Sequence, residues 1–413
     1  MIVAVPLVST ALAAAVSPSS DKQALAAIDE FASYCGGGAE LWGVSLCGPL
    51  IFVDPSTRQA VASADPGVGG FTKEGRAWVG QLPAGISIAN TSIQLGSRKF
   101  AEITLPLPAD TLNRRVLLAH ESFHRIQPEL GFTGQEADNS HLDTKDGRIW
   151  ARMEMAALKA ALGDKDWRPA ARDALTFRAK RLALFPNAEE AETKLIANEG
   201  LAEYTGVKVG AGANADDFAI QRLDTGADRP SLIRTFGYVV GPAYGLLLDR
   251  LSSNWRPAAL KGRPLPELLA EALLPPHKMT KTDYGKDRIV AEETARDDRI
   301  QQRRRDLTEE LIDGPTVTFP GSDLQLNFDP NTLFSLGTAG MVYGRETSVR
   351  GSWGSLKATG DVLLAPGWSY ARVQGPAQVQ DDTVVGPGWT AKLLPGYALV
   401  PDKKAGSFIV QKQ

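Results

Sequence analysis

The feature that most constrains this fold is a succession of three sequence patterns along 413 residues. Residues 40–110 hold short apolar runs separated by Gly, Pro and Asp, which is typical of β-strands. Residues 111–314 follow a helical periodicity, and residues 315–413 return to short alternating runs rich in Gly, Pro and Trp. We therefore expect an α+β fold, in which a small β-sheet precedes a mainly helical region and a separate β-sandwich or barrel occupies residues 315–413.

The composition excludes several classes of protein. The chain is 43% hydrophobic and 23% charged, as in ordinary globular proteins. Its formal net charge of -3 argues against a general nucleic-acid binder, which would carry a basic excess. No segment beyond the N-terminus reaches about eighteen uncharged apolar residues, so we expect no stable membrane insertion.

The N-terminus has the pattern of an export signal. Residues 1–15 are apolar but shorter than the roughly twenty residues that span a bilayer, and Ala11, Ala13 and Ala15 offer A-x-A cleavage sites. No Lys or Arg precedes the apolar run, so a start codon further upstream and a buried N-terminal element are the alternatives. We expect residues 1–15 to be a signal peptide and the protein to be periplasmic or extracellular.

The two cysteines, Cys35 and Cys47, flank a Gly-rich loop. Export would favour a disulfide between them, whereas two unrelated buried thiols are the alternative.

The chemistry-bearing motif is His120-Glu121-Ser122-Phe123-His124, an H-E-x-x-H sequence that contains two of only four histidines. Residues i and i+4 share one face of a helix, so both imidazoles can bind one metal ion while Glu121 reaches toward a metal-bound water. Asp110 or Thr111 can cap this helix at its start, and Pro128 can end it. A helix with two partly buried histidines and a salt-bridged glutamate is the alternative.

A catalytic zinc ion needs a third protein ligand and one open position. Leu130 stands where an extended H-E-x-x-H-x-x-G-x-x-H motif would need a third histidine, so we expect a carboxylate, with Glu154, Glu199 and Glu203 as candidates. Glu199 and Glu203 lie at i and i+4 in an apolar helical segment, where one can bind zinc and the other can accept a hydrogen bond from a ligating imidazole. Two surface glutamates on an amphipathic helix are the alternative.

HESFH followed by NEGLAEY (198–204) resembles the gluzincin metallopeptidases, especially the aminopeptidase-N-like and glycyl-aminopeptidase families. The resemblance implies a zincin-like catalytic domain over residues 16–314. It also implies one Zn²⁺ per chain held by His120, His124 and Glu199, with Glu121 as the catalytic base. The segment GYVVGPAYGLLLD (237–249) resembles the tyrosine helix of those families, which makes Tyr238 the candidate oxyanion donor.

Three departures accompany this resemblance. The gap between His124 and Glu199 is much longer than in those families, so the helices expected at 147–184 must lie within it. Val240 replaces a lysine before Gly241, and the G-x-M-E-N exopeptidase motif is absent upstream of His120.

The expected function is hydrolysis of a peptide or protein substrate by a zinc-activated water, with Glu121 as general base. A zinc amidase acting on cell-wall or other non-protein amides is one alternative. A non-catalytic binding protein, in which the C-terminal β domain engages a partner, is another.

Several further residues are weaker candidates for the cleft. Tyr204 and Tyr244 are alternative oxyanion donors, and His141 can line the cleft or bind substrate. The segment 100–107, just before the motif helix, can pair with an extended substrate by β-addition or can be an ordinary core strand.

Overall fold

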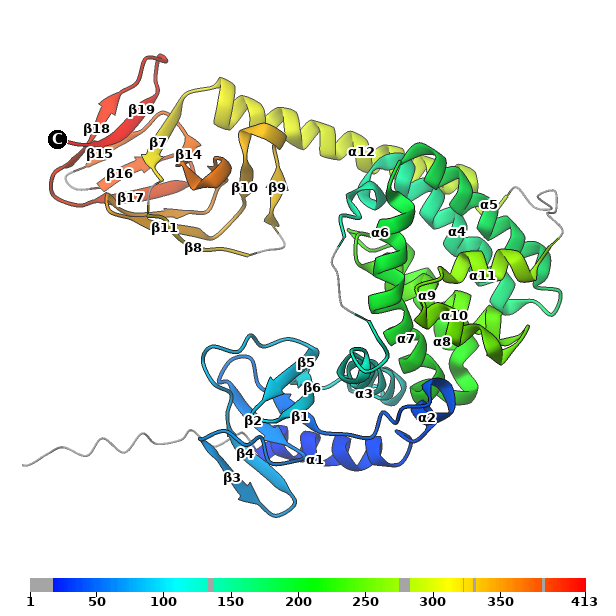
Figure 1. The fold of residues 1–413 in the computed structure, drawn as a ribbon. Coiled ribbons are helices and arrows are strands. Elements are labelled where there is room, and N and C mark those ends of the chain that lie inside the picture. The colour runs from blue at the N-terminus through cyan, green and yellow to red at the C-terminus, as the bar shows by residue number, and fades with distance from the viewer. Residues whose placement is uncertain (1–17, 133–136, 275–282, 322, 330–331, 381–382) are drawn as a thin grey trace, which may run out of the picture. The chain divides into compact units, whose positions relative to one another are not determined.

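The computed structural model describes residues 18–132, 137–274, 283–321, 323–329, 332–380 and 383–413. The expected signal peptide, residues 1–15, lies outside them. The chain divides into two compact units, one ending at Glu293 and the other beginning at Thr294 (Figure 1). This division falls within helix α12 (Lys286–Thr308), earlier in the chain than the change of composition at Gly314.

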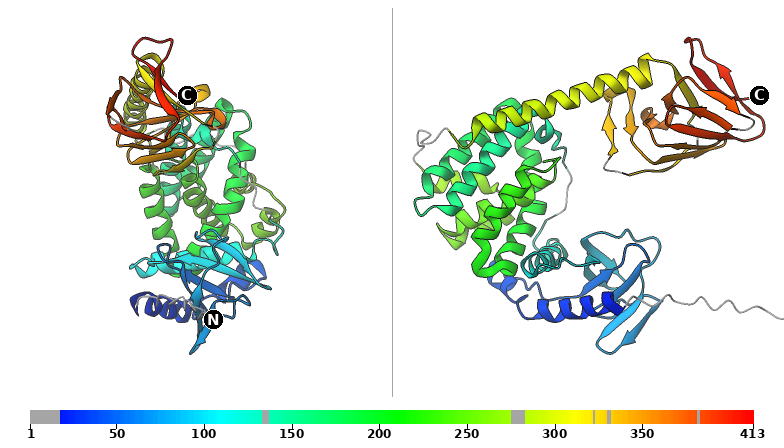
Figure 2. Two further views of the ribbon diagram at one scale, coloured as in Figure 1. Left: turned by 90° about the vertical axis from the view of Figure 1, so that its left-hand side faces the viewer. Right: turned by 180° about the vertical axis from the view of Figure 1, so that it is seen from behind.

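The first unit contains a six-stranded mixed sheet. Its strands are β1 (Leu50–Val53), β2 (Gln59–Ala62), β3 (Phe71–Glu74), β4 (Ala77–Gln81), β5 (Thr91–Leu95) and β6 (Arg98–Thr104). The order is β3-β4-β2-β1-β6-β5, and only the β1–β6 pair is parallel. Leu50, Phe52 and Ile103 pack on one face with helices α1 (Pro18–Ala32) and α3 (Thr111–Ile126), and Ile51, Val53 and Phe100 form a core on the other. Figure 2 shows helix α1, in dark blue, running alongside this sheet.

The expectation that segment 100–107 accepts a substrate strand is wrong. Strand β6 pairs with β1 on one side and with β5 on the other, so both of its hydrogen-bonding edges are used. The edge strand on this side of the sheet is β5, which pairs with β6 alone in the described part of the chain.

Helices make up the rest of the first unit. They are α2 (Gly37–Trp42), α4 (Lys145–Gly163), α5 (Arg168–Leu184), α6 (Ala188–Leu195), α7 (Leu201–Gly206), α8 (Ala215–Ala227), α9 (Thr235–Asp249), α10 (Arg256–Leu260) and α11 (Leu265–Ala272). The π-helical turn Ile196–Gly200 joins α6 to α7, and a second one, Val207–Ala211, extends α7, so residues 188–211 form one continuous helix. Periodicity predicts neighbouring helices at 188–208 and 229–253 but none over α8, since Phe218 and Leu223 are the only large apolar side chains among the buried residues of α8.

The second unit contains two sheets that share one core. Its strands are β7 (Thr316–Pro320), β8 (Gln325–Asn327), β9 (Phe334–Ser335), β10 (Met341–Tyr343), β11 (Thr347–Gly351), β12 (Gly354–Ala358), β13 (Val362–Leu364), β14 (Tyr370–Gln374), β15 (Gln378–Gln380), β16 (Thr383–Gly386), β17 (Trp389–Leu393), β18 (Tyr397–Pro401) and β19 (Phe408–Lys412). One sheet runs β18-β19-β7-β14-β13-β10-β9 and the other β15-β16-β17-β12-β11-β8. Phe319 of the first sheet contacts Trp353 and Trp389, which belong to the second sheet's side of the core. This is the C-terminal all-β region that the composition predicted.

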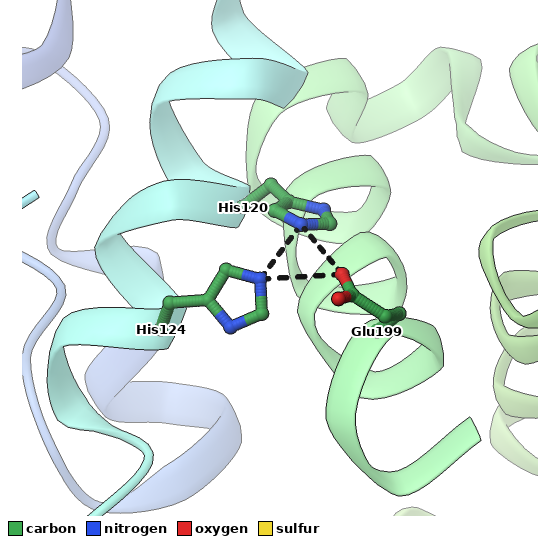
Figure 3. A group of neighbouring side chains, drawn as sticks. All are labelled: His120, His124 and Glu199. Atoms are coloured by element: carbon green, nitrogen blue, oxygen red, sulfur yellow. Dashed lines mark hydrogen bonds and ion pairs between the residues drawn. The ribbon is translucent and has the colours of Figure 1, made fainter. Parts of the chain in front are cut away.

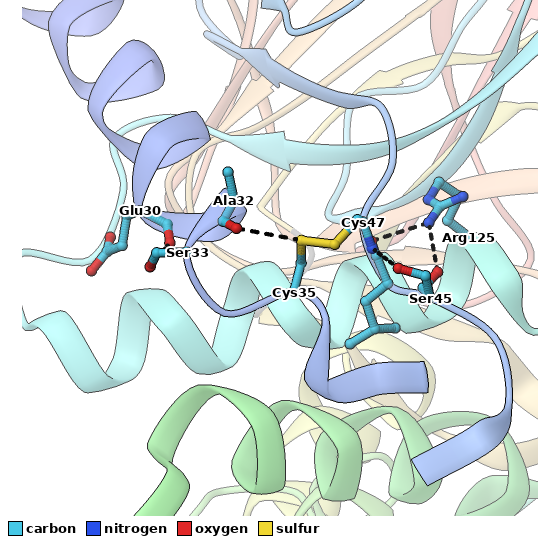
Figure 4. The surroundings of a disulfide bond; sticks show 8 residues. Glu30, Ala32, Ser33, Cys35, Ser45, Cys47 and Arg125 are labelled. Carbon is cyan, nitrogen blue, oxygen red and sulfur yellow. Dashed lines mark hydrogen bonds between the residues drawn. A yellow bond between two sulfur atoms is a disulfide. The ribbon is translucent and has the colours of Figure 1, made fainter. Parts of the chain in front are cut away.

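Cys35 and Cys47 form the expected disulfide, with their Cα atoms 5.0 Å apart (Figure 4). Closing so short a loop stabilises the folded state by roughly 3 kcal/mol in the chain-entropy model. Arg125 of α3 donates to the carbonyl of Leu46 inside this loop, at 3.1 Å. The disulfide loop is therefore tied to the helix that carries the H-E-x-x-H motif.

Across the described helices, none is both long enough and apolar enough to cross a bilayer.

Candidate metal centre

Helix α3 presents the two motif histidines from a fixed position. The Asp110 side chain accepts a hydrogen bond from the backbone N–H of Asn113 at 2.8 Å and so caps the helix, which ends at Ile126. Val116, Leu118 and Phe123 are buried against the core, so the helix cannot rotate without exposing them. His120 and His124 lie one turn apart and point toward the same side (Figure 3).

Glu199 lies in the π-helical turn Ile196–Gly200, a distortion that often occurs at functional sites. Helix α9 packs directly on this turn at two glycines. A Cβ atom on Gly241 would lie only 2.3 Å from the Cα of Gly200, so a larger residue cannot replace Gly241 without separating the helices. This close approach brings the start of α9, including Arg234 and Tyr238, next to Glu199.

Three potential ligand atoms converge between helix α3 and the π-helical turn that carries Glu199 (Figure 3). The His120 Nε2 and His124 Nε2 atoms are 3.0 Å apart, and Glu199 Oε2 lies 3.7 Å and 3.5 Å from them, respectively. A tetrahedral zinc ion with bonds of about 2.0–2.1 Å holds its ligand atoms about 3.3–3.4 Å apart. The three separations bracket that value, so the residues present fit a zinc ion.

The other nitrogen of each imidazole has a hydrogen-bond acceptor. His120 Nδ1 lies 2.7 Å from Glu203 Oε2, and His124 Nδ1 lies 2.6 Å from Gln127 Oε1. The Gln127 amide nitrogen donates to the carbonyl of Asn198 at 2.8 Å, which fixes its oxygen toward His124. Both imidazoles thus donate through Nδ1, as metal-binding histidines do, and their Nε2 atoms face each other.

Two carboxylate oxygens at this centre are buried without a hydrogen-bond partner in the described part of the chain: Glu121 Oε2 and Glu199 Oε2. Burial raises the pKa of Glu121, reinforced by Glu199 and Glu203 and opposed by the two imidazoles. Burial also disfavours ionised Glu199, but contacts with the imidazoles outweigh it and hold the pKa of Glu199 well below its usual range.

The pKa of His120 is set by the carboxylates of the same cluster. Burial lowers the pKa of this imidazole, yet the surrounding carboxylates, first Glu121 and then Glu199 and Glu203, raise it to about 10. The carboxylates therefore favour positive charge on His120, at the position where a metal ion would supply it.

Tyr238 and Arg234 complete the surroundings of Glu199. The Tyr238 ring stacks on the His120 ring, with centroids 5.4 Å apart and planes 4° from parallel. Burial and the adjacent Glu199 raise the pKa of the Tyr238 phenol, so it stays protonated and can donate a hydrogen bond. Arg234, which sequence reasoning missed, lies 3.1 Å from Glu199 Oε1; its place just before the tyrosine helix is the only sequence signal.

The rival third ligand, Glu154, does not join this cluster. Its carboxylate accepts hydrogen bonds from Arg181 and from the Tyr244 hydroxyl, both at 2.6 Å, and all three side chains are buried in the helical core. Because both of its oxygens are used, Glu154 is not placed to bind a metal, and Tyr244 is not placed to donate to a substrate.

The remaining weaker candidates also lie in internal hydrogen-bond networks. The Tyr204 hydroxyl donates to Asp249 at 2.8 Å and is fully buried. His141 Nε2 lies 2.9 Å from Glu192, which in turn forms an ion pair with Arg181. Of the two, His141 does not belong to the group formed by His120, His124 and Glu199, and the Tyr204 hydroxyl is held by Asp249.

A scan against protein-family models, a search of curated proteins and a search of solved structures each find no match.

Proposed function

We propose that this protein is a zinc-dependent peptidase of the gluzincin type, with a zincin-like catalytic region in its first unit and one Zn²⁺ per chain. The observation that carries the proposal is the convergence of His120 Nε2, His124 Nε2 and Glu199 Oε2 from two helices, at separations that suit a tetrahedral ion. Glu121 supports it further, since a purely structural metal site has no need of a buried carboxylate between its two histidine ligands.

His120, His124 and Glu199 would hold the ion and leave its fourth position open. When bound, zinc supplies a Lewis acid that polarises the scissile carbonyl and acidifies water. Glu121 takes a proton from the attacking water and delivers it to the leaving amine. The protonated Tyr238 phenol, held beside Glu199, donates a hydrogen bond to the oxyanion that develops on the substrate.

The fold suggests how a peptide or protein substrate is held. Strand β5 is the edge strand next to the motif helix, so an extended peptide can add to its free side by main-chain hydrogen bonds. We propose that the protein acts after export to the periplasm or extracellular space, where its Cys35–Cys47 disulfide is stable. The β-sandwich of the second unit is then a module for binding substrate or a partner.

Metal analysis and one isosteric substitution test the proposal. We expect one zinc per chain by plasma emission spectroscopy, lost in both His120→Ala and Glu199→Ala. Glu121→Gln should keep the zinc and lose about 100- to 10,000-fold in peptide turnover, because general-base catalysis contributes that much. Glu129→Gln is the matched control, because it makes the same change at an exposed position shortly after the motif helix.

Peptide libraries and cell-wall fragments should be digested in parallel. Cleavage of peptide bonds that depends on Glu121 supports the peptidase, whereas cleavage restricted to cell-wall amides identifies the amidase instead. Full turnover by Glu121→Gln, or a zinc content unaffected by His120→Ala, would contradict the proposed site.

A further inference from the structure

Arg234 is an exposed cation at the edge of the candidate metal centre. Its side chain is 71% exposed, yet one of its terminal nitrogens lies 3.1 Å from Glu199 Oε1. An arginine this exposed normally samples many rotamers in water. Here the ion pair with a buried carboxylate holds one side of the guanidinium and leaves most of it open to a ligand.

The two oxygens of Glu199 face different partners. Oε2 points toward the imidazoles of His120 and His124, and Oε1 points toward Arg234. The guanidinium and the centre where the ligand atoms converge are therefore separated by the width of one carboxylate group. A substrate whose reacting carbonyl lies at that centre must pass close to Arg234.

The charges at the site favour an anionic group in that position. A second guanidinium, from Arg222, lies 3.5 Å from Glu203, and its side chain is 40% exposed, so Glu199 and Glu203 each contact an arginine at the surface. Of the two, Arg234 contacts the carboxylate that faces both imidazoles. Guanidinium groups bind carboxylates through paired N–H donors and provide strong, directional recognition.

The spacing of a peptide chain matches this arrangement. Successive carbonyl groups of an extended chain are about 3.3–3.6 Å apart, so a carboxylate one residue beyond the scissile bond lies within reach of a group beside the centre. We propose that Arg234 is a specificity-determining residue that binds a substrate carboxylate next to the scissile bond. This inference rests on the proposed function and narrows its substrates to peptides that carry a carboxylate at that position.

A binding experiment tests the contact without relying on turnover. In a Glu121→Gln background, the dipeptide Ala-Ala and its C-terminal amide should be titrated calorimetrically into the zinc-loaded protein. We expect the free acid to bind about 10- to 100-fold more tightly than the amide, as for one charge-assisted hydrogen-bonded pair. Arg234→Gln should remove this difference and leave binding of the amide within about twofold.

Arg222→Gln is the charge-matched control. If it reduces the preference for the free acid as much as Arg234→Gln does, the effect is general electrostatics and the inference is wrong. Arg234→Lys should keep only part of the preference, because an ammonium group provides charge without the paired donors. If Arg234→Gln weakens both dipeptides equally, or lowers zinc content, Arg234 only positions Glu199 and the inference fails.

Hydrolysis of matched peptides distinguishes the two sources of a carboxylate. One pair has a free or amidated C-terminus, and the other has an amidated C-terminus with Asp or Asn after the scissile bond. The inference predicts a lower KM, with little change in kcat, for the carboxylate member of at least one pair. Equal KM values in both pairs would overturn it while leaving a zinc peptidase intact, whereas absence of zinc and of hydrolysis would overturn the proposed function.

Discussion

Two buried clusters in the first unit are built from the same residue types and differ in how their charges are satisfied. At the candidate metal centre, Glu199 and Glu203 lie beside His120, and Glu199 Oε2 has no hydrogen-bond partner in the described structure. In the second cluster, which we call the Arg181 cluster, Arg181 lies between Glu154 and Glu192 and bonds to both.

The difference separates a structural role from a binding role. Arg181 supplies the cation of its cluster from within the chain, so no ligand is needed there. At the candidate metal centre the carboxylates instead raise the pKa of His120, and Glu121 Oε2 and Glu199 Oε2 have no hydrogen-bond partner in the described residues. Buried carboxylate oxygens without a hydrogen-bond partner, next to two converging imidazoles, therefore support a binding role for this cluster.

Removing Arg181 should have the largest effect on stability. Arg181→Met leaves Glu154 and Glu192 buried without their cation, which should cost about 3–5 kcal/mol in urea-induced unfolding. The exposed Arg263 also forms ion pairs, but Arg263→Met should cost far less stability than Arg181→Met because surface pairs contribute little. Similar losses for both variants would show that the Arg181 cluster does not hold the helices together.

Glu102 of β6 is a further buried carboxylate, and neither of its oxygens has a hydrogen-bond partner in the described part of the chain. It is 0% exposed, and burial raises its pKa to about 7. The folded protein keeps this proton up to about pH 7, whereas the unfolded chain loses it above about pH 4.5, so stability falls as pH rises through that window.

The expected loss across this window is roughly 3 kcal/mol, at about 1.4 kcal/mol per pKa unit. Urea unfolding between pH 4.5 and 8 measures it, and Glu102→Gln should flatten the profile. If the variant retains the wild-type pH dependence, another group is responsible.

Zinc should stabilise the protein through the metal centre alone. At a free zinc concentration 100 times the dissociation constant, binding adds about 2.7 kcal/mol to the free energy of unfolding. Glu199→Gln should abolish this increment, while Arg263→Met should retain it. The comparison needs urea titrations with zinc and with a chelator, and an equal zinc effect in Glu199→Gln would exclude Glu199 as a ligand.

The smallest expected effect concerns the hydrogen bond behind His120. Glu203→Gln should weaken zinc binding by about 10- to 100-fold without removing a ligand, because Glu203 orients the imidazole. Competition with a chromophoric chelator measures the change, and Glu129→Gln serves as the exposed control. Unchanged affinity would show that Glu203 is not needed for orientation.

Much of the fold could be predicted from local patterns. The helix of His120 and His124 is capped by Asp110 and ends before Pro128, and residues of these two types predict the start and the end of a helix from the sequence alone. Helix α8 was not predicted because it has few large apolar residues. The internal position of β6 was not predicted either, because it depends on which strands lie on each side of β6 in the sheet.

The sequence by itself determined that two histidines share a helical face and that Glu199 and Glu203 share another, because helical periodicity places residues i and i+4 together. Only the tertiary structure decided that Glu199, and not Glu154, meets the histidines, and that Arg234 lies beside it. Periodicity constrains positions within one helix, whereas contact between helices far apart in the chain depends on packing, here on the close approach of Gly200 and Gly241.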